Sequence, residues 1–250
     1  MVVTSMVLEI FSDEERTHLS DEVLYGHSVG VLERRTDGLF RVVTEQGHVG
    51  FCDPSCLWDV DAEKGAYRVH YRTDALASAE ITAMKVMTLP RFAHVSVEAD
   101  CGAFYRVRLF DGREGYVHRA HLLPPKTGEA TPDEVCDVAL SLLGVPYRYG
   151  GRSAVALDCS GLVSLAFGFC GVVLPRDTAD LAALPEVPAE TARRGDLVLF
   201  DGHVGILLTR TRFVHASASF GFVAISSLDK RDPLYDLVHA PCGFTVRRVF

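Results

Sequence analysis

The sequence has no long apolar run. No stretch of the 250 residues approaches the ~20 consecutive apolar residues of a membrane-spanning helix. The segment from Met1 to Glu9 has no positively charged start, and Glu9 interrupts its apolar part early, so we expect no signal peptide. These two absences predict a chain without a membrane partner.

Positive charge is also in short supply. The chain has 25 Lys and Arg against 33 Asp and Glu, which gives a net charge of −8. This balance argues against nucleic acid as a partner and against non-specific adhesion to anionic polymers or membranes. It suits a small substrate better than a long polyanion. The hydrophobic share of 48% is ordinary for a globular protein, and the length suggests two or three domains.

The cysteines have no regular spacing. There are seven, an odd number, which does not suggest a disulfide framework. Cys52 and Cys56 lie four positions apart, but no second Cys/His pair with zinc-site spacing lies near them. We therefore expect free thiols, no metal site, no cofactor and a reducing cytoplasm as the location.

One cysteine does lie in a context that indicates chemistry. Cys159 stands between Asp158 and Ser160, both common N-cap residues, and an apolar run at helical spacing follows it. In the first turn of a helix, unpaired N–H groups and the helix dipole favour a thiolate and can hold an oxyanion. The alternative is that Cys159 is simply a small buried hydrophobic residue.

Two histidines follow on predicted strands. His203 begins one apolar run after the turn signal Asp201-Gly202, and His215 lies near the end of the next run. Antiparallel pairing can bring two such positions together. We predict Cys159 as the nucleophile, His203 as its base and His215 as the group that orients His203. Six other histidines fall in no pattern that we can interpret: His18, His70, His94, His118, His121 and His239.

The segments around these three residues resemble the NlpC/P60 family of cell-wall peptidases. The matching segments are Gly144–Gly151, Asp158–Val163, Pro175–Asp177, Arg194–Phe200, Gly202–Ile206 and Phe213–Ala216. The resemblance implies a papain-like α+β fold. It also implies hydrolysis of peptide bonds in murein stem peptides, typically after γ-linked D-glutamate, with no metal.

The N-terminal half contains an internal repeat with an offset of 65 residues. Equivalent pairs include Phe40 and Tyr105, Gly47 and Gly112, Gly50 and Gly115, Phe51 and Tyr116, and Leu57 and Leu122. Short alternating runs between glycine-containing turns predict small β-units. The glycine–aromatic pairs resemble those of bacterial SH3-like (SH3b) modules, which implies two small barrels.

We therefore predict an α+β chain of three domains. Residues 1–62 and 63–126 are expected to be SH3-like β-barrels, and residues 127–250 a papain-like NlpC/P60 domain with an antiparallel sheet. The linker Leu123–Ala130 contains two prolines and a glycine. Thr131 then caps a helix that has Pro132 first and Glu134 third and ends at Gly144.

The resemblance also implies substrate-binding residues in the third domain. Asp158 and Ser160 would bind the free amine of an N-terminal L-alanine, or they would only cap the helix. Tyr147 would line the active site, or it would be a half-buried aromatic residue. Arg176 would contact a substrate carboxylate or pair with a nearby Asp177 or Asp180, and we favour the pairing.

The first module departs from the family pattern at one position. His48 stands where relatives with SH3-like modules place an active-site tyrosine. An acidic residue that helps to bind the substrate amine would be Asp13 or Glu14, although the run Asp13-Glu14-Glu15 is also explained as a solvated turn.

The sequence thus predicts a cytoplasmic cysteine endopeptidase of cell-wall recycling. Its substrates would be short murein peptides with a free N-terminal L-alanine, cleaved at the γ-D-glutamyl–diamino acid bond. One alternative is a thiol amidase or acyltransferase on the same fold. The other is a non-catalytic wall-binding protein whose SH3-like modules bind the wall.

Overall fold

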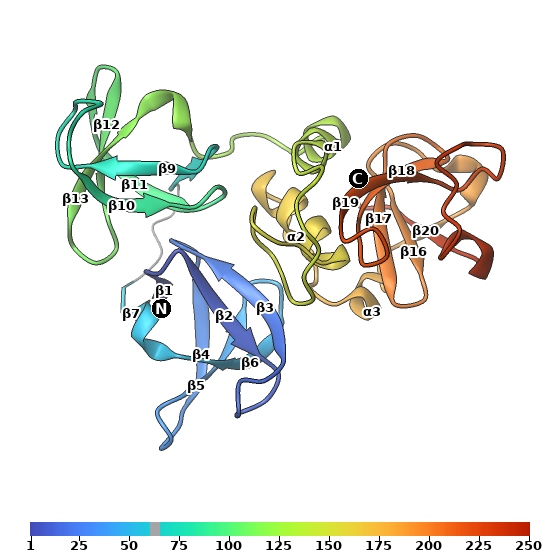
Figure 1. The fold of residues 1–250 in the computed structure, drawn as a ribbon, viewed down its shortest axis with the longest axis horizontal. Coiled ribbons are helices and arrows are strands. Elements are labelled where there is room, and N and C mark those ends of the chain that lie inside the picture. Colours follow the sequence, from blue (N-terminus) through green and yellow to red (C-terminus); the bar gives the residue numbers. More distant parts are fainter. Residues whose placement is uncertain (61–65) are drawn as a thin grey trace. The chain divides into compact units, whose positions relative to one another are not determined.

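A computed structural model describes residues 1–60 and 66–250 (Figure 1). The predicted boundary between the two modules, at residues 62 and 63, lies outside the described residues. The chain divides into a first unit, Met1–Glu45 with Val49–Thr127, and a second unit, Gln46–His48 with Gly128–Phe250. Within the described ranges, no helix combines the length and the apolar character needed to cross a membrane.

The first half of the first unit is an antiparallel β-structure. Its elements are β1 (Val2–Val3), β2 (Val7–Phe11), β3 (Leu19–Leu24), β4 (Val29–Arg34), β5 (Phe40–Thr44), β6 (Val49–Cys52), the 3-10 helix η1 (Pro54–Cys56) and β7 (Leu57–Trp58). The main sheet has the order β3-β2-β6-β5-β4, and β1 pairs with β7. Leu8 and Ile10 alternate into the core, as the two-residue period of a strand requires.

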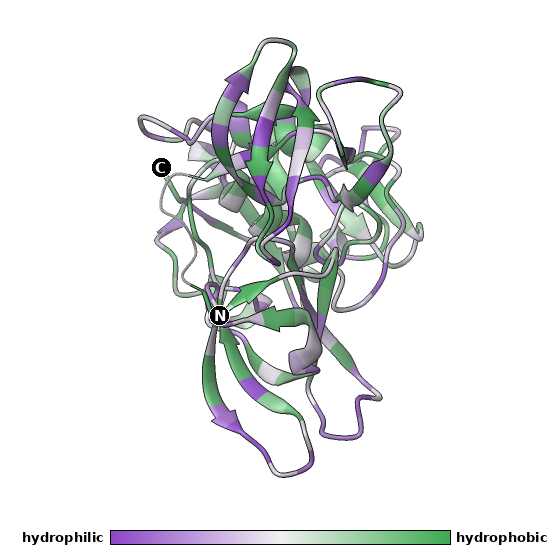
Figure 2. Cartoon of the chain, turned by 90° about the vertical axis from the view of Figure 1, so that its left-hand side faces the viewer, coloured by the Kyte–Doolittle hydropathy of each residue, from purple (hydrophilic) through white to green (hydrophobic). Residues whose placement is uncertain are grey.

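The second half of the first unit repeats this plan. Its elements are β8 (Tyr67–Val69), β9 (Thr73–Leu76), β10 (Lys85–Leu89), β11 (His94–Cys101), β12 (Phe104–Arg108), β13 (Glu114–His118), the 3-10 helix η2 (Arg119–His121) and β14 (Leu122–Leu123). The sheet order is β10-β9-β13-β12-β11-β8-β14. Figure 2 shows hydrophobic and hydrophilic bands that alternate along strands, the pattern of sheets with one buried face.

The sequence repeat coincides with a structural repeat. The series β4, β5, β6, η1, β7 in the first copy corresponds to β11, β12, β13, η2, β14 in the second. Gly50 and Gly115 have the same structural role in the two copies. A Cβ on Gly50 would lie 2.6 Å from the Phe11 carbonyl oxygen, and a Cβ on Gly115 would lie 2.9 Å from the Ala75 Cβ. Each glycine therefore admits a neighbouring strand.

The pairing of these strands differs from the barrel prediction in one respect. In the part of the chain that the structure describes, both sheets are open, with β3 and β4 at the edges of one and β10 and β14 at the edges of the other. Closed barrels are not what the pairings give, so the SH3-like assignment stays a proposal.

The second unit combines short helices with one antiparallel sheet. Its helices are α1 (Pro132–Leu140), α2 (Cys159–Phe169), α3 (Thr178–Leu181) and the 3-10 helices η3 (Ala189–Thr191) and η4 (Ala240–Cys242). Its strands are β15 (Glu186–Val187), β16 (Leu197–Phe200), β17 (His203–Leu207), β18 (Arg212–Ser217), β19 (Phe222–Ser227) and β20 (Thr245–Arg247). The sheet order is β15-β20-β16-β17-β18-β19. Helix α2 packs against α1, β17 and β18 (Figure 1).

Capping fixes where α1 starts. Thr131 and Glu134 form the predicted capping box, with Pro132 in the first helical position. The helix ends at Leu140, earlier than the predicted Gly144. Gly144 instead adopts a left-handed φ of 81° in the turn that follows, where its N–H donates to the Val223 carbonyl.

Candidate active site

Cys159 is the first residue of α2, as predicted. The Asp158 carboxylate caps the helix by accepting the Gly161 N–H at 2.7 Å. A Cβ on Gly161 would lie 2.1 Å from the Gly151 carbonyl oxygen, so only glycine lets the preceding loop pack on the first turn. That loop adds a second bond, from the Gly150 N–H to Asp158 at 2.8 Å. Together these contacts fix the position of the buried Cys159.

His203 and His215 meet on one face of the sheet. His203 opens β17 and His215 lies in β18, and the register that pairs Ile206 with Val214 points both side chains the same way. His203 Nε2 lies 2.7 Å from His215 Nδ1. His215 Nε2 lies 2.9 Å from the Ser226 hydroxyl of β19. The three side chains form a continuous hydrogen-bonded chain.

A glycine makes room for the two histidines. Gly205 lies between them on the same face of β17, and a Cβ there would lie 2.6 Å from the Phe213 ring and 3.3 Å from the His215 Cβ. Any side chain at this position would displace the rings that must meet. This explains the glycine in the segment Gly202–Ile206 in physical terms.

The thiol lies beside the start of β17. Burial raises the pKa of the Cys159 thiol, and hydrogen bonds from the Val204 N–H, the Thr178 hydroxyl and the Ser160 N–H offset part of that rise. Val204 is the residue after His203. The Thr178 hydroxyl oxygen lies 4.0 Å from the Cys159 sulfur. The structure therefore brings together all three residues that the sequence named as catalytic.

Burial keeps this site uncharged. It raises the pKa of the Cys159 thiol, and the Asp158 carboxylate raises it further. It also lowers the pKa of His203 to about 3 and that of His215 to about 4. The position of Cys159 at the helix start predicts a thiolate. In the free protein that direction is wrong, because desolvation outweighs the nearby N–H groups.

The residues flanking Cys159 are held by a buried arginine. Arg176 donates to both Asp158 oxygens, at 3.0 and 2.7 Å, and to the Ser160 hydroxyl at 2.7 Å. All three side chains are buried. The sequence pointed to a pairing of Arg176 with Asp177 or Asp180, whereas the structure shows an ion pair with Asp158. The sequence missed this pair because its members lie on different elements.

The other predicted substrate-binding residues fall in both units. Tyr147 is half-buried, and burial, with the Cys159 thiol as the next cause, raises its pKa to about 12. His48 belongs to the second unit, where its Nδ1 lies 3.2 Å from Asp177 Oδ2. In the first unit, Asp13 accepts the Thr17 and His18 N–H groups and Glu14 pairs with Arg35 at 2.7 Å.

One residue near the pair was missed. The His239 ring stacks on the His203 ring, with centroids 4.0 Å apart and planes 12° from parallel. His239 Nδ1 lies 3.2 Å from Asp236 Oδ2. His239 lies between β19 and β20, in a segment without helical or strand periodicity, so nothing local marked it.

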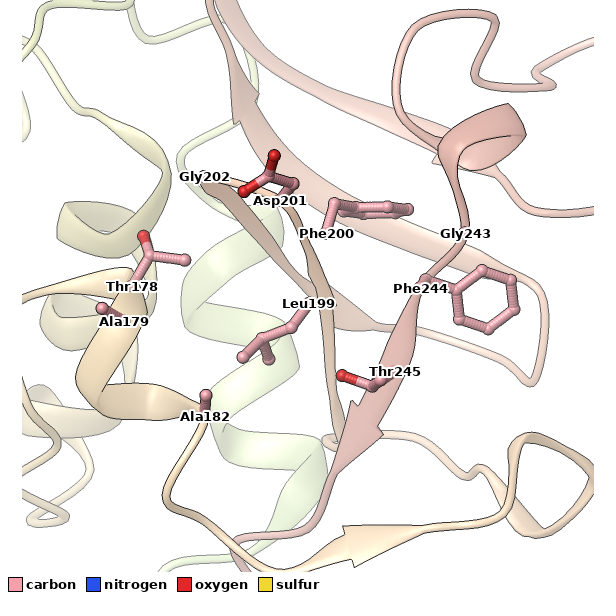
Figure 3. A pocket seen from close by; sticks show the side chains of 10 residues that line it. All are labelled: Thr178, Ala179, Ala182, Leu199, Phe200, Asp201, Gly202, Gly243, Phe244 and Thr245. Carbon is pink, nitrogen blue, oxygen red and sulfur yellow. The ribbon is translucent and has the colours of Figure 1, made fainter.

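A pocket of about 510 Å³ lies next to this site (Figure 3). Its lining comes from α3, β16, the β16–β17 turn and β20: Thr178, Ala179, Ala182, Leu199, Phe200, Asp201, Gly202, Gly243, Phe244 and Thr245. Thr178 also approaches the Cys159 sulfur, and Gly202 directly precedes His203. The pocket can therefore receive one side of a peptide whose carbonyl lies at the thiol.

Comparison with known proteins identifies relatives of the chain. The NlpC/P60 family matches residues 144–240. Dipeptidyl-peptidase 6 of Lysinibacillus sphaericus is 32% identical over 254 residues, which cover 94% of this chain and 93% of that protein. Gamma-D-glutamyl-L-lysine dipeptidyl-peptidase of Bacillus subtilis (strain 168) is 26% identical over 167 residues, 63% of this chain and 53% of its own length.

The fold also has a solved counterpart. The crystal structure of an NlpC/P60 family protein from Bacillus cereus superposes with a TM-score of 0.83, covering 99% of this chain and 98% of that one. Their sequences are 16% identical, so the likeness is one of fold alone.

Proposed function

Since the chain belongs to the NlpC/P60 family, we propose that it is a cysteine endopeptidase that hydrolyses the γ-D-glutamyl–diamino acid bond of short murein peptides. The observation that carries this proposal is the 2.7 Å contact between His203 and His215 beside Cys159 at the start of α2. A nucleophile, a base and a group that orients the base are the parts that covalent hydrolysis of an amide needs.

The chemistry follows from the uncharged site. His215 Nε2 donates to Ser226, which leaves its Nδ1 to accept the His203 Nε2–H. His203 Nδ1 then keeps the lone pair that takes the thiol proton as the sulfur attacks the carbonyl carbon. The Cys159 backbone N–H stabilises the oxyanion, with the Tyr147 hydroxyl as a second donor. His203 gives the proton to the leaving amine, and water hydrolyses the thioester. No step requires a metal.

The substrate class rests on the relatives and the pocket. The relative from Bacillus subtilis carries γ-D-glutamyl-L-lysine in its name. In our proposal the pocket next to Thr178 holds the diamino acid, whose aliphatic stem would pack on Leu199, Phe200 and Phe244. The Asp201 carboxylate at its rim would attract the terminal ammonium group.

The other end of the substrate carries a free N-terminal L-alanine in this proposal. Asp158 and Ser160 bind its amine and His48 lies close to it. Because Asp158 already shares its charge with Arg176, it would bind a cation less strongly than an unpaired carboxylate. The proposal also assigns residues 1–62 and 63–126 to SH3-like domains, and the protein to wall-peptide recycling in the cytoplasm.

The test is to incubate L-Ala-γ-D-Glu-L-Lys and its meso-diaminopimelate counterpart with the protein and to identify the products by mass. We expect L-Ala-D-Glu and the free diamino acid, and no products from the Cys159→Ala variant. Cleavage of a different amide would favour the amidase or acyltransferase alternative. Intact peptides together with sedimentation of the protein on murein would favour the wall-binding alternative.

A further inference from the structure

We propose that His203, His215 and His239 form a Zn²⁺ site whose occupation inactivates the enzyme. Each imidazole offers one ligand atom, and these atoms lie within 4.8 Å of one another. This inference goes beyond the proposed function. The prediction that zinc inhibits hydrolysis rests on the proposed function, whereas the prediction that the three imidazoles bind a metal ion does not.

Two of the imidazoles are oriented as metal ligands usually are. His239 Nδ1 faces Asp236 Oδ2 at 3.2 Å, and His215 Nε2 faces the Ser226 hydroxyl at 2.9 Å. In metal sites the second nitrogen of a ligating histidine donates to such a partner, which fixes the tautomer and leaves the other nitrogen its lone pair. His239 Nε2 and His215 Nδ1 are the atoms left to bind here.

The donor spacing requires only small movements. Zinc lies about 2.0–2.1 Å from imidazole nitrogens, so tetrahedral ligands are about 3.3 Å apart. His203 Nε2 and His215 Nδ1, now 2.7 Å apart, must separate slightly. The His239 ring, stacked parallel to His203, must tilt to bring its nitrogen into line. His239 is on the segment between β19 and β20 and is only partly buried, so it can make this adjustment.

The donor set selects the class of metal. Imidazole nitrogens suit Zn²⁺, Cu²⁺ and Ni²⁺, whereas Mg²⁺ and Ca²⁺ prefer oxygen. Three histidines leave a fourth position for water, which is a common zinc geometry.

A metal ion also has a route to the cluster. A pocket of about 370 Å³ is lined by His239, Asp236 and neighbouring residues of β18, β19 and the segment after β19. The side of the cluster formed by His239 therefore faces an open volume, while His203 and His215 are buried behind it.

Zinc would inactivate the base by changing its tautomer. His203 can accept the thiol proton only while its hydrogen is on Nε2 and its lone pair on Nδ1. A metal bound at Nε2 requires the lone pair on Nε2, so the Nε2 hydrogen must leave and the neutral ring carries its hydrogen on Nδ1. The His203–His215 hydrogen bond is lost in the same event. The bound enzyme then has no lone pair with which to accept the Cys159 proton.

The inhibition arm compares zinc titrations of peptide hydrolysis in chelator-treated buffer. His239→Phe keeps a ring on His203 but removes the ligand, and His239→Asn is a second variant with a different shape. We expect both to hydrolyse peptide without added metal and to need at least ten-fold more zinc for half-inhibition. His18→Phe is the matched control, because His18 Nδ1 also faces a carboxylate, Asp13, at 3.1 Å but lies outside the cluster. Its zinc sensitivity should equal that of the wild type.

The binding arm uses Co²⁺ as a spectroscopic probe of the imidazoles. The protein carries Cys159→Ala, Cys101→Ser and Cys242→Ser, which remove the catalytic thiol and the two exposed thiols. We expect the visible absorption of four-coordinate Co²⁺ at one equivalent, and its loss with either His239 variant, with folding checked by thermal melting. Retention of this absorption in the folded His239 variants, or unchanged zinc sensitivity in them, overturns the proposal.

Discussion

At the scale of single residues, the proposed chemistry depends on the protonation states of Cys159 and His203 in the protein without substrate. Burial raises the pKa of the Cys159 thiol and lowers that of His203 to about 3, so both are neutral at neutral pH. The proton then moves only during attack on the carbonyl. In the proposed mechanism His203 is the base, and His215 has a different role, the control of the His203 tautomer.

The two histidines should therefore differ in what their loss costs. His203→Ala should lower kcat as far as Cys159→Ala does, by roughly 10⁶-fold, because the two residues act as a unit. His215→Ala should cost less, between roughly 10²- and 10⁴-fold, since it removes orientation only. Steady-state kinetics on one peptide ranks the three variants. A nearly normal His203→Ala beside an inactive His215→Ala would show that the two roles are reversed.

Substitution of Gly205 should lower activity although Gly205 takes no part in the chemistry. Gly205→Ala puts a Cβ 2.6 Å from the Phe213 ring and 3.3 Å from the His215 Cβ, so one of these rings must move. We expect at least a ten-fold loss of kcat/KM. Gly168→Ala in α2 is the control, because its Cβ would meet nothing within 4 Å. Equal activity of the two variants would mean that the spacing of the histidines does not matter.

At the scale of elements, an ion pair stabilises the start of α2 in addition to the Asp158 cap. Arg176 neutralises Asp158 inside the protein, with both side chains almost fully buried. Removing one member of such a pair leaves an uncompensated buried charge. The loop before α3, which carries Arg176, is in this way tied to the residue that precedes the nucleophile.

Arg176→Met should lower the free energy of unfolding by about 3–5 kcal/mol. Arg194→Met removes the partly exposed partner of Asp133 and Asp137 and should cost at most about 1 kcal/mol. Urea unfolding of both variants measures the difference. If Arg176→Met also carries Asp158→Asn, part of the loss should return. A loss no larger than that of Arg194→Met would contradict this account of the buried pair.

The sequence predicts element starts better than element ends. Thr131 and Asp158 carry their capping signals within three residues, and both helices begin where expected. The end of α1 depends on packing, and it comes before Gly144. The direction of the Cys159 pKa shift was also missed, because burial depends on the whole sheet and not on the helix start.

At the scale of the whole molecule, the sequence repeat was the readable feature of the first unit. Gly50 and Gly115, which lie 65 residues apart, occupy equivalent strands of two copies, and the strands follow in the same order in both copies. The motif order Cys159, His203, His215 predicted the meeting of three elements in the second unit. His239 was not predictable, because its position depends on a segment without periodic pattern folding back over His203.

A whole-molecule consequence of the proposed specificity is a requirement for a free substrate amine. A charge-assisted hydrogen bond from that amine to an acid is worth ~1.5–3 kcal/mol. N-acetylation of L-Ala-γ-D-Glu-L-Lys should thus lower kcat/KM by roughly ten- to a hundred-fold. Competition between free and acetylated peptides in one reaction gives the ratio directly. Equal cleavage, or efficient digestion of intact cross-linked wall, would favour a site that accepts longer chains.

The central claim is that Cys159 attacks the γ-carbonyl of D-glutamate. The most direct measurement is to mix the protein with L-Ala-γ-D-Glu-L-Lys, quench in acid during turnover and map adducts by mass spectrometry. The account predicts a thioester-linked L-Ala-D-Glu group on Cys159 alone, absent from Cys159→Ala. An adduct on another residue, or product formation by Cys159→Ala, would contradict it.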